Sequence, residues 1–348
     1  MRWVTEERGA AAVLTAVSLT ALIAMAAFAI DTGALYAERR ELQNGADAAA
    51  LAIAEDCAHE ILPCTGAFAQ ITGDAYADAN ASDSAALIHD IALDPTGKTV
   101  TVTVRSEDEA GETVMAPFFA QVIGFDGTEV QAAATAEWGW PNSTPVPPLI
   151  ISDCEFHPDG VVPDDGDTFI FFFHDGASVE PCHDSGSGFD LPGGFGWLDI
   201  GADPDGVAYD CGIYLVRDEK YDADPGASPS TGCSPETLKD SLMPPRDGSE
   251  HGPTVLPYFK RCEEGAVECV DSGVEGLGNN IQYTVAGYGG FHVLGYNFGG
   301  QYKEIMPDGS LPCTGDERCI AGYHTPVTIH DGELGGPDRG VILIKLTN

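Results

Sequence analysis

Positively charged side chains are scarce in this sequence of 348 residues. Lys and Arg number 16 against 55 Asp and Glu, which gives a formal net charge of -39. A surface this acidic repels phosphate backbones and anionic headgroups over most of its area. Nucleic acid is therefore excluded as a partner class, and the acidity is typical of a well-solvated exterior.

Several motifs for catalysis and metal binding are also absent. No CxxC pair occurs, so the paired knuckles of a structural zinc site are missing. No serine stands at the centre of a Gly-x-Ser-x-Gly elbow, and there is no HExxH helix. We therefore expect no catalytic residue, no metal site, no cofactor and no enzymatic activity.

Histidines and acidic turns in the middle of the chain form only loose candidates for ligand sites. The Asp/Gly turns lack the bidentate Glu of an EF-hand, and the spacing of the histidines fits no HExxH helix. We interpret the acidic set as turns and Cys182 as a disulfide partner rather than a nucleophile. These candidates are His157, His174 and His183 for a metal, and Asp159, Asp164, Asp165 and Asp167 for calcium.

Cysteine is abundant and appears only after the first fifty residues. Ten cysteines indicate an oxidising compartment, in which disulfides persist. Three pairs are close in sequence and are our disulfide candidates: Cys57 with Cys64, Cys262 with Cys269, and Cys313 with Cys319.

One long apolar segment, Gly9–Ile30, contains no charged side chain. As an α-helix its run of about 22 residues spans roughly 33 Å, close to the hydrocarbon thickness of a bilayer. The hydroxyls of Thr15, Ser18 and Thr20 can donate to carbonyls of the preceding turn. We therefore predict a transmembrane helix over 9–30 that serves as a signal anchor.

A cleaved signal peptide is the competing interpretation of this segment, because Ala27-Phe28-Ala29 satisfies the A-x-A rule. The apolar run is longer than the roughly 7–15 residues usual in signal peptides, which favours a retained anchor. Arginines flank the run on both sides and do not set its orientation. The cysteines place the chain after Asp31 outside the cytosol, which leaves residues 1–8 in the cytoplasm of a single-pass cell-membrane protein.

The helical pattern continues beyond the apolar run to Ala58. Small and apolar residues recur there at spacings of three, four and seven, on one face of the helix. Such a stripe either packs in the protein's own core or forms a seam with another subunit, where small residues allow close approach. Asp31 and the Arg39-Arg40 pair are expected to fix the depth of the helix. The stripe consists of Leu35, Leu42, Ala46, Ala49 and Ile53.

A longer motif encloses these segments. It begins at Arg8, passes through the apolar helix to Ala29-Ile30-Asp31-Thr32-Gly33, and closes with Arg-Arg-Glu-Leu-Gln-Asn-Gly-Ala-Asp-Ala-Ala-Ala-Leu-Ala at 39–52. This N-terminal module resembles the TadE/TadG-like proteins of Flp (tight-adherence, Tad) pilus assembly in bacteria. Segments 193–199 and 319–323 are similar to the C-terminal extension of actinobacterial members. The resemblance implies a membrane-anchored structural or accessory protein of pseudopilin-like build.

The partners implied by this resemblance are other Tad pilus or pseudopilin subunits and assembly components of the cell envelope. Processed pilins carry a Gly before the mature N-terminus and a Glu five residues into the mature helix. Here Leu14 stands five residues beyond Gly9, so a permanently anchored accessory role is implied. The alternative function is a membrane-tethered extracellular binding module, for calcium or glycan, or a hydrolase that uses a common anchor.

The chain beyond the anchor divides by composition. Residues 31–140 are expected to form a long helix and a small α+β head, with a strand at 99–105 and a helix at 116–124. Residues 141–148 are rich in proline and predict a stiff linker. Residues 149–348 alternate apolar segments with Gly, Asp and Pro, as in a β-rich, disulfide-containing domain. The predicted fold class is α+β.

Overall fold

The computed structural model describes residues 7–80, 86–106, 114–115, 117–156, 168–173, 195–200, 210–224, 229–230, 232–245, 251–259, 274–275 and 282–347. The chain forms two compact units, one of Met1–Trp138 with Ile344–Asn348 and one of Gly139–Leu343. The last residues therefore return to the unit that contains the N-terminal helix. The predicted α+β class is confirmed: a long apolar helix and a small helix precede a strand-rich region, and three disulfides lie among the described residues.

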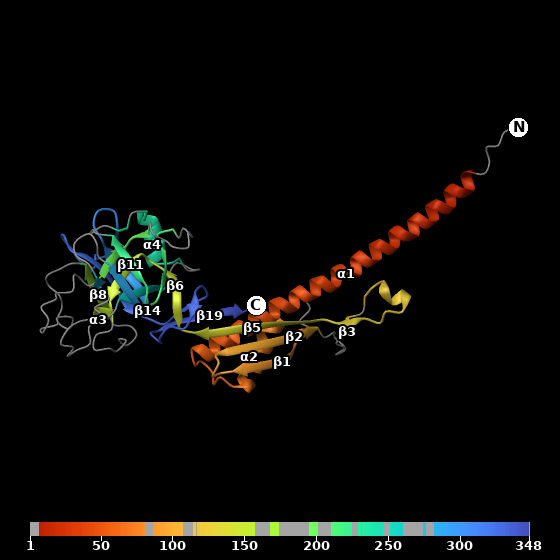
Figure 1. Ribbon diagram of the computed structural model, residues 1–348, viewed down its shortest axis with the longest axis horizontal. Helices are drawn as coiled ribbons and strands as arrows, with labels where there is room; N and C mark the ends of the chain where they lie inside the picture. The colour runs from red at the N-terminus through yellow and green to blue at the C-terminus, as the bar shows by residue number, and fades with distance from the viewer. Residues whose placement is uncertain are drawn as a thin grey trace. The chain divides into compact units, whose positions relative to one another are not determined.

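The first unit is built on one helix of 52 residues, α1 (Glu7–Ala58), whose second half packs against a second helix and a sheet (Figure 1). The second helix, α2 (Gly66–Ala79), contacts both α1 and β1. The strands of this sheet follow one another in the order β1 (Ala86–Asp94), β2 (Thr99–Ser106), β5 (Gln131–Gly139) and the end of β19 (Val341–Thr347).

Strand β2 shows how the sequence directs this packing. Its side chains alternate between partly and fully buried, and Val100, Val102 and Val104 are all completely buried. A strand directs successive side chains to opposite faces, so the three valines share one face, and α1 contacts this strand. At the turn before β2, a carboxylate oxygen of Asp94 accepts hydrogen bonds from the backbone amides of Thr96 and Gly97.

Helices α1 and α2 approach each other closely at two glycines. A Cβ on Gly45 would lie 3.4 Å from the carbonyl oxygen of Ala77, and one on Gly73 would lie 3.3 Å from Cδ1 of Ile53. Glycine within a helix costs about 0.5–1 kcal/mol relative to alanine. Here it leaves space for a neighbouring backbone and for an isoleucine side chain.

The end of β19 belongs to the first unit through side-chain contacts with β5. Lys345 Nζ lies 3.2 Å from a carboxylate oxygen of Glu137, and the hydroxyl of Thr347 donates to the carbonyl of Thr135 at 3.3 Å. The partners advance in opposite directions along the two strands, so β5 and β19 run antiparallel.

The helix predicted at 116–124 is only a short 3₁₀ turn, η1 (Ala120–Ile123). It ends at Gly124, whose φ of +85° lies in the left-handed region that favours glycine. It lies between β3 (Val114–Met115) and β4 (Thr128–Glu129), which pair antiparallel. The prediction rested on Pro117 near the start and Gly124 at the end of the segment, and it is wrong in length. Little packing stabilises a longer helix here, because Phe118 and Val122 are 83% and 86% exposed.

The second unit contains a large sheet whose order is β11-β9-β7-β12-β14-β16-β8. Strand β11 pairs with both β9 and the start of β14, so the strands from β11 to β14 close into a ring. The pairing of β12 with β7 is parallel, and the other pairings in this sheet are antiparallel. The bounds are β7 (Leu149–Ser152), β8 (Phe169–Phe173), β9 (Phe195–Leu198), β11 (Lys220–Asp224), β12 (Thr254–Phe259), β14 (Gln282–Asn297) and β16 (Arg318–His324).

Smaller elements complete this unit. Helix α4 starts with a capping box, in which the side chains of Ser234 and Thr237 each accept from the other residue's backbone amide. Strands β13 and β15 pair with β14, and β17 pairs in parallel with the first residues of β19. The bounds are α3 (Asp153–Phe156), α4 (Pro235–Leu242), β10 (Ile213–Val216), β13 (Val274–Glu275), β15 (Lys303–Glu304), β17 (Val327–Ile329) and β18 (Glu333–Leu334).

The linker predicted at 141–148 is wrong over most of its length. Residues Pro141–Val146 form strand β6, which lies between β10 and β18. The carbonyl of Asn142 accepts a hydrogen bond from the amide of Arg217 just beyond β10. The backbone N–H and C=O groups of the even-numbered residues of β6 therefore point toward β10. The backbone nitrogen of Pro145 points to the opposite side, toward β18, which pairs only with Ser143 and Pro141. Its missing N–H therefore removes no bond between strands.

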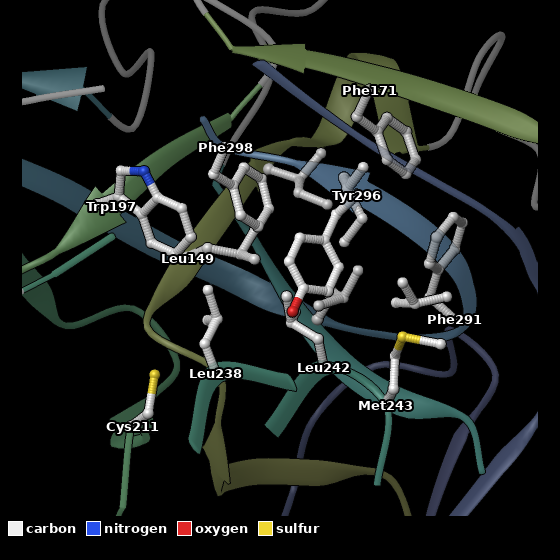
Figure 2. Close-up of a cluster of buried hydrophobic side chains, with 14 of the residues drawn as sticks. Leu149, Phe171, Trp197, Cys211, Leu238, Leu242, Met243, Phe291, Tyr296 and Phe298 are labelled. Carbon is white, nitrogen blue, oxygen red and sulfur yellow. The ribbon is translucent and has the colours of Figure 1, made fainter. Parts of the chain in front are cut away.

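Aromatic side chains fill one core of the second unit and pack on glycines of its strands. Trp197 and Phe298 meet edge to face, with ring centroids 4.9 Å apart, within the cluster shown in Figure 2. The ring of Phe156 occupies the place where a Cβ of Gly289 would lie, and Tyr258 does the same at Gly287. Burial raises the pKa of Tyr258 to about 12, as expected for a phenol held away from water.

Replacement of Gly289 by alanine tests this packing. The new methyl group would overlap the Phe156 ring, so we expect Gly289→Ala to cost about 1–3 kcal/mol or more. For a unit of this size that corresponds to a fall in Tm of about 2–4 °C per kcal/mol. Near-ultraviolet circular dichroism during heating measures it. Gly66→Ala is the control, because no atom lies within 4 Å of that position; equal Tm values for the two variants would contradict this account.

Candidate membrane anchor

The first half of α1 presents a continuous apolar surface. Its segment from Gly9 is long and apolar enough to cross a membrane, and none of the most apolar stretch is buried within the protein. Phe28 is 72% exposed and Leu14 67% exposed. The hydroxyls of Thr15 and Thr20 donate to the carbonyls of Ala11 and Ala16 at 2.8 Å, as their sequence positions suggested. These bonds satisfy the polar groups inside the helix, which a lipid environment requires.

Asp31 ends the apolar run and is held by backbone amides. Its side chain is only 7% exposed, and its carboxylate accepts from the amide of Ala120 at 2.8 Å and from that of Phe119 at 3.2 Å. These amides lie at the start of η1, where a helix has no internal partner for them. Hydrogen bonds to a charged acceptor are roughly twice as strong as those between neutral groups. The carboxylate therefore ties η1 to the end of the apolar helix.

The basic pair that follows Asp31 is exposed to solvent. Both Arg39 and Arg40 lie on the surface, and the guanidinium carbon of Arg40 is 5.6 Å from the ring centroid of Tyr36. That distance allows a cation–π contact worth about 0.5–1 kcal/mol at an exposed site. The role of this pair and of Asp31 in setting the depth of the helix stays a prediction.

The stripe on the second half of α1 is covered by the protein's own residues. Leu42, Ala46, Ala49 and Ile53 are at most 2% exposed, while Leu35 is half-buried. The elements that contact this part of the first unit's long helix include α2 and β2. Internal packing therefore accounts for four of these side chains, which leaves no accessible surface on them for a seam with another subunit. Helical spacing identified the face but did not reveal what covers it.

Disulfides occur within each of the two units. Cys57 at the end of α1 is bonded to Cys64 just before α2, and Cys313 is bonded to Cys319. A third bond, between Cys211 and Cys233, links residues 22 positions apart and was not among the candidates, which were chosen by short separation. Cys262 and Cys269 lie outside the described residues. No cysteine is free among the side chains that the structure describes.

The looser ligand candidates from the sequence fall outside the described residues. This applies to His157, His174, His183 and Cys182, and to the acidic set Asp159, Asp164, Asp165 and Asp167. Within the described ranges, no group of three or more His, Cys, Asp or Glu residues is arranged to hold a metal ion. The described part of the chain therefore adds no side-chain cluster in support of a metal-binding module.

Residues 9–55 match the model of a family described as "Putative Flp pilus-assembly TadE/G-like". This segment is therefore similar to that family and is called here the TadE/G-like module. The matched segment contains the whole apolar run, Asp31 and the buried stripe as far as Ile53, and it stops just before the Cys57–Cys64 disulfide. No curated protein and no solved structure matches the chain. The TadE/G-like module thus covers the exposed apolar first half of α1 and most of its buried second half.

A charge placed in the buried stripe of the TadE/G-like module should unfold the first unit locally. Ala49 is fully buried, so Ala49→Asp puts an unpaired carboxylate among apolar side chains, at a cost of several kcal/mol. Hydrogen exchange of α2 and β2 should then increase sharply. Ala37→Asp is the matched control, because it makes the same change at an exposed position of the same helix. Unchanged protection in Ala49→Asp would show that the stripe is not internal core.

Removal of the Asp31 carboxylate should release the start of η1. Asp31→Ala deletes the acceptor for the amides of Phe119 and Ala120. Hydrogen bonds to charged groups contribute about 1.5–3 kcal/mol. Exchange of these two amides should therefore accelerate about 10- to 100-fold in hydrogen-exchange mass spectrometry. Asp31→Asn retains one acceptor oxygen and should give an intermediate rate, while Asp126→Ala, at an exposed site, should have no effect.

Proposed function

We propose that this protein is a permanently anchored, single-pass accessory component of Tad (Flp) pilus assembly at the cell envelope, pseudopilin-like in build. Residues 9–30 span the cell membrane and residues 1–8 lie in the cytoplasm. The chain from Asp31 onward lies outside the cytoplasm and acts there without catalysing a reaction. Its partners are other Tad pilus or pseudopilin subunits and envelope components, and the TadE/G-like match supports this assignment.

The proposal rests on one observation: α1 is a single unbroken helix whose first half is exposed and whose second half packs in the core of the first unit. Nine large apolar side chains between residues 13 and 30 are more than half exposed: Val13, Leu14, Val17, Leu19, Leu22, Ile23, Met25, Phe28 and Ile30. Burying each such side chain fully contributes about 1.5–3 kcal/mol, so leaving all nine in water would cost roughly 14–27 kcal/mol. A bilayer removes that cost.

The same helix argues against cleavage after Ala29. The backbone stays helical through Ala27-Phe28-Ala29 and beyond, and the hydroxyl of Thr32 donates back to the carbonyl of Phe28 at 2.7 Å. A signal peptidase site needs an extended segment, which this stretch of helix does not offer. Cleavage there would also place a new terminus next to Asp31, at the point where η1 is attached.

The disulfides support the proposed orientation. Bonds in both units require an oxidising compartment, and a long domain crosses the membrane largely regardless of its flanking charges. A net charge of -39 also favours a hydrated position away from anionic headgroups.

Deletion and complementation in a piliated host test the proposal. Loss of the chain should reduce Flp pili counted by electron microscopy, and the full chain should restore them. A version in which a cleavable secretion signal replaces residues 1–30 should be released from the membrane and should fail to restore pili. Normal piliation without the chain would contradict the pilus role, and restoration by the released version would contradict the need for an anchor.

A further inference from the structure

We propose that residues 117–125, called here the interfacial loop, insert into the outer membrane–water boundary beside the spanning helix and form a second lipid contact of the first unit. The proposal rests on the membrane anchor proposed above. Figure 1 shows the loop as the yellow segment that follows β3 and lies alongside α1, and the structure records contacts between α1 and η1.

The interfacial loop exposes its largest apolar side chains. Phe118 is 83% exposed, Val122 86%, Phe125 47% and Phe119 44%, whereas Pro117 is buried. Four large exposed apolar side chains within one short loop are more than the single, scattered exposure that is normal on a protein surface. Patches of this kind indicate contact with a membrane or with another protein.

The height of the loop along the helix identifies lipid as the occupant. Its amides at Phe119 and Ala120 bond to Asp31, the residue that directly follows the apolar run. A run of about 22 residues is roughly 33 Å long and fills a hydrocarbon core of about 30 Å, so Asp31 lies at the outer boundary. Interfacial segments bury their apolar faces about 5–10 Å into this zone. The loop is thus held at the depth at which its phenylalanines meet acyl chains.

The bonds to Asp31 also make this position favourable for the carboxylate. A charged group at the edge of the hydrocarbon is costly unless its oxygens are satisfied, and the η1 amides satisfy them. The loop itself carries no cationic side chain: its polar residue is Gln121, and the acidic Asp126 follows it in sequence. Insertion therefore depends on apolar contact, so it should occur on a zwitterionic bilayer and be insensitive to salt.

A second membrane contact restricts the motion of the first unit. A helix alone is free to rotate about its axis and to tilt, because its length sets neither angle. The loop lies on one side of α1 and would hold that side against the lipid. Tilting of the helix away from this side would then require Phe118 and Val122 to leave the membrane.

Photocrosslinking in a bilayer tests the inference directly. The full chain is reconstituted in phosphatidylcholine vesicles with the photoreactive residue p-benzoylphenylalanine in place of Phe118 or, separately, Val122. Both positions are more than four-fifths exposed, so the substitutions leave the fold intact. We expect a lipid-mass adduct on the loop peptide in each variant, at low and at high salt. The same residue at Ile71 on α2, which is 65% exposed, is the control and should give no lipid adduct.

The outcomes separate the loop from the anchor. The photoreactive residue at Phe28, within the apolar run, should always give a lipid adduct if the helix spans the bilayer. A lipid adduct at Phe28 with none at Phe118 and Val122 would overturn the loop inference and leave the anchor standing. An adduct to a second protein chain at Phe118 would overturn it in favour of a subunit contact. No lipid adduct at Phe28 would remove the anchor and this inference together.

Discussion

The structure depends on one continuous helix, α1, whose first half is apolar and exposed and whose second half packs in the core of the first unit. All backbone groups of a helix bond within the helix, so α1 passes from a region without contacts to a packed core with no change in its backbone. What changes is the side chains: large exposed apolar residues before Asp31, and small buried ones after Leu42. The sheet of the first unit packs against the second half of this helix, and the first half is the proposed membrane anchor.

Sequence reasoning identified the helix and its two halves because both depend on local patterns. A charge-free run indicates lipid, and recurrence at three and four residues indicates one helix face. The same patterns could not show that Ala46 and Ala49 are covered from within, because periodicity says nothing of the neighbour. The bond between Asp31 and Phe119 joins residues 88 positions apart, and no local pattern predicts such a contact.

The second unit shows where rules about single residues fail. Residues 141–148 were predicted to form a linker because they are rich in proline, yet β6 contains Pro141 and Pro145 and lies between two neighbouring strands. Strand β12 contains Pro257, and its parallel pairing with β7 begins only at the following residue. In both strands, the pairing between strands avoids the position at which proline lacks an N–H group. The Cys211–Cys233 bond was overlooked for a related reason, since short separation is not what brings cysteines together.

The antiparallel neighbours β5 and β19 are the two points at which the chain passes between the units. Tension on the second unit would draw both strands lengthwise in the same direction. The load would fall on the ladder between β2 and β5, which is in register from Thr99 opposite Glu137 to Arg105 opposite Gln131. Hydrogen bonds of such a ladder lie across the strands, so under shear they resist together instead of opening one after another. Mechanically, the second unit is therefore an insertion whose two ends are held by neighbouring strands of one sheet.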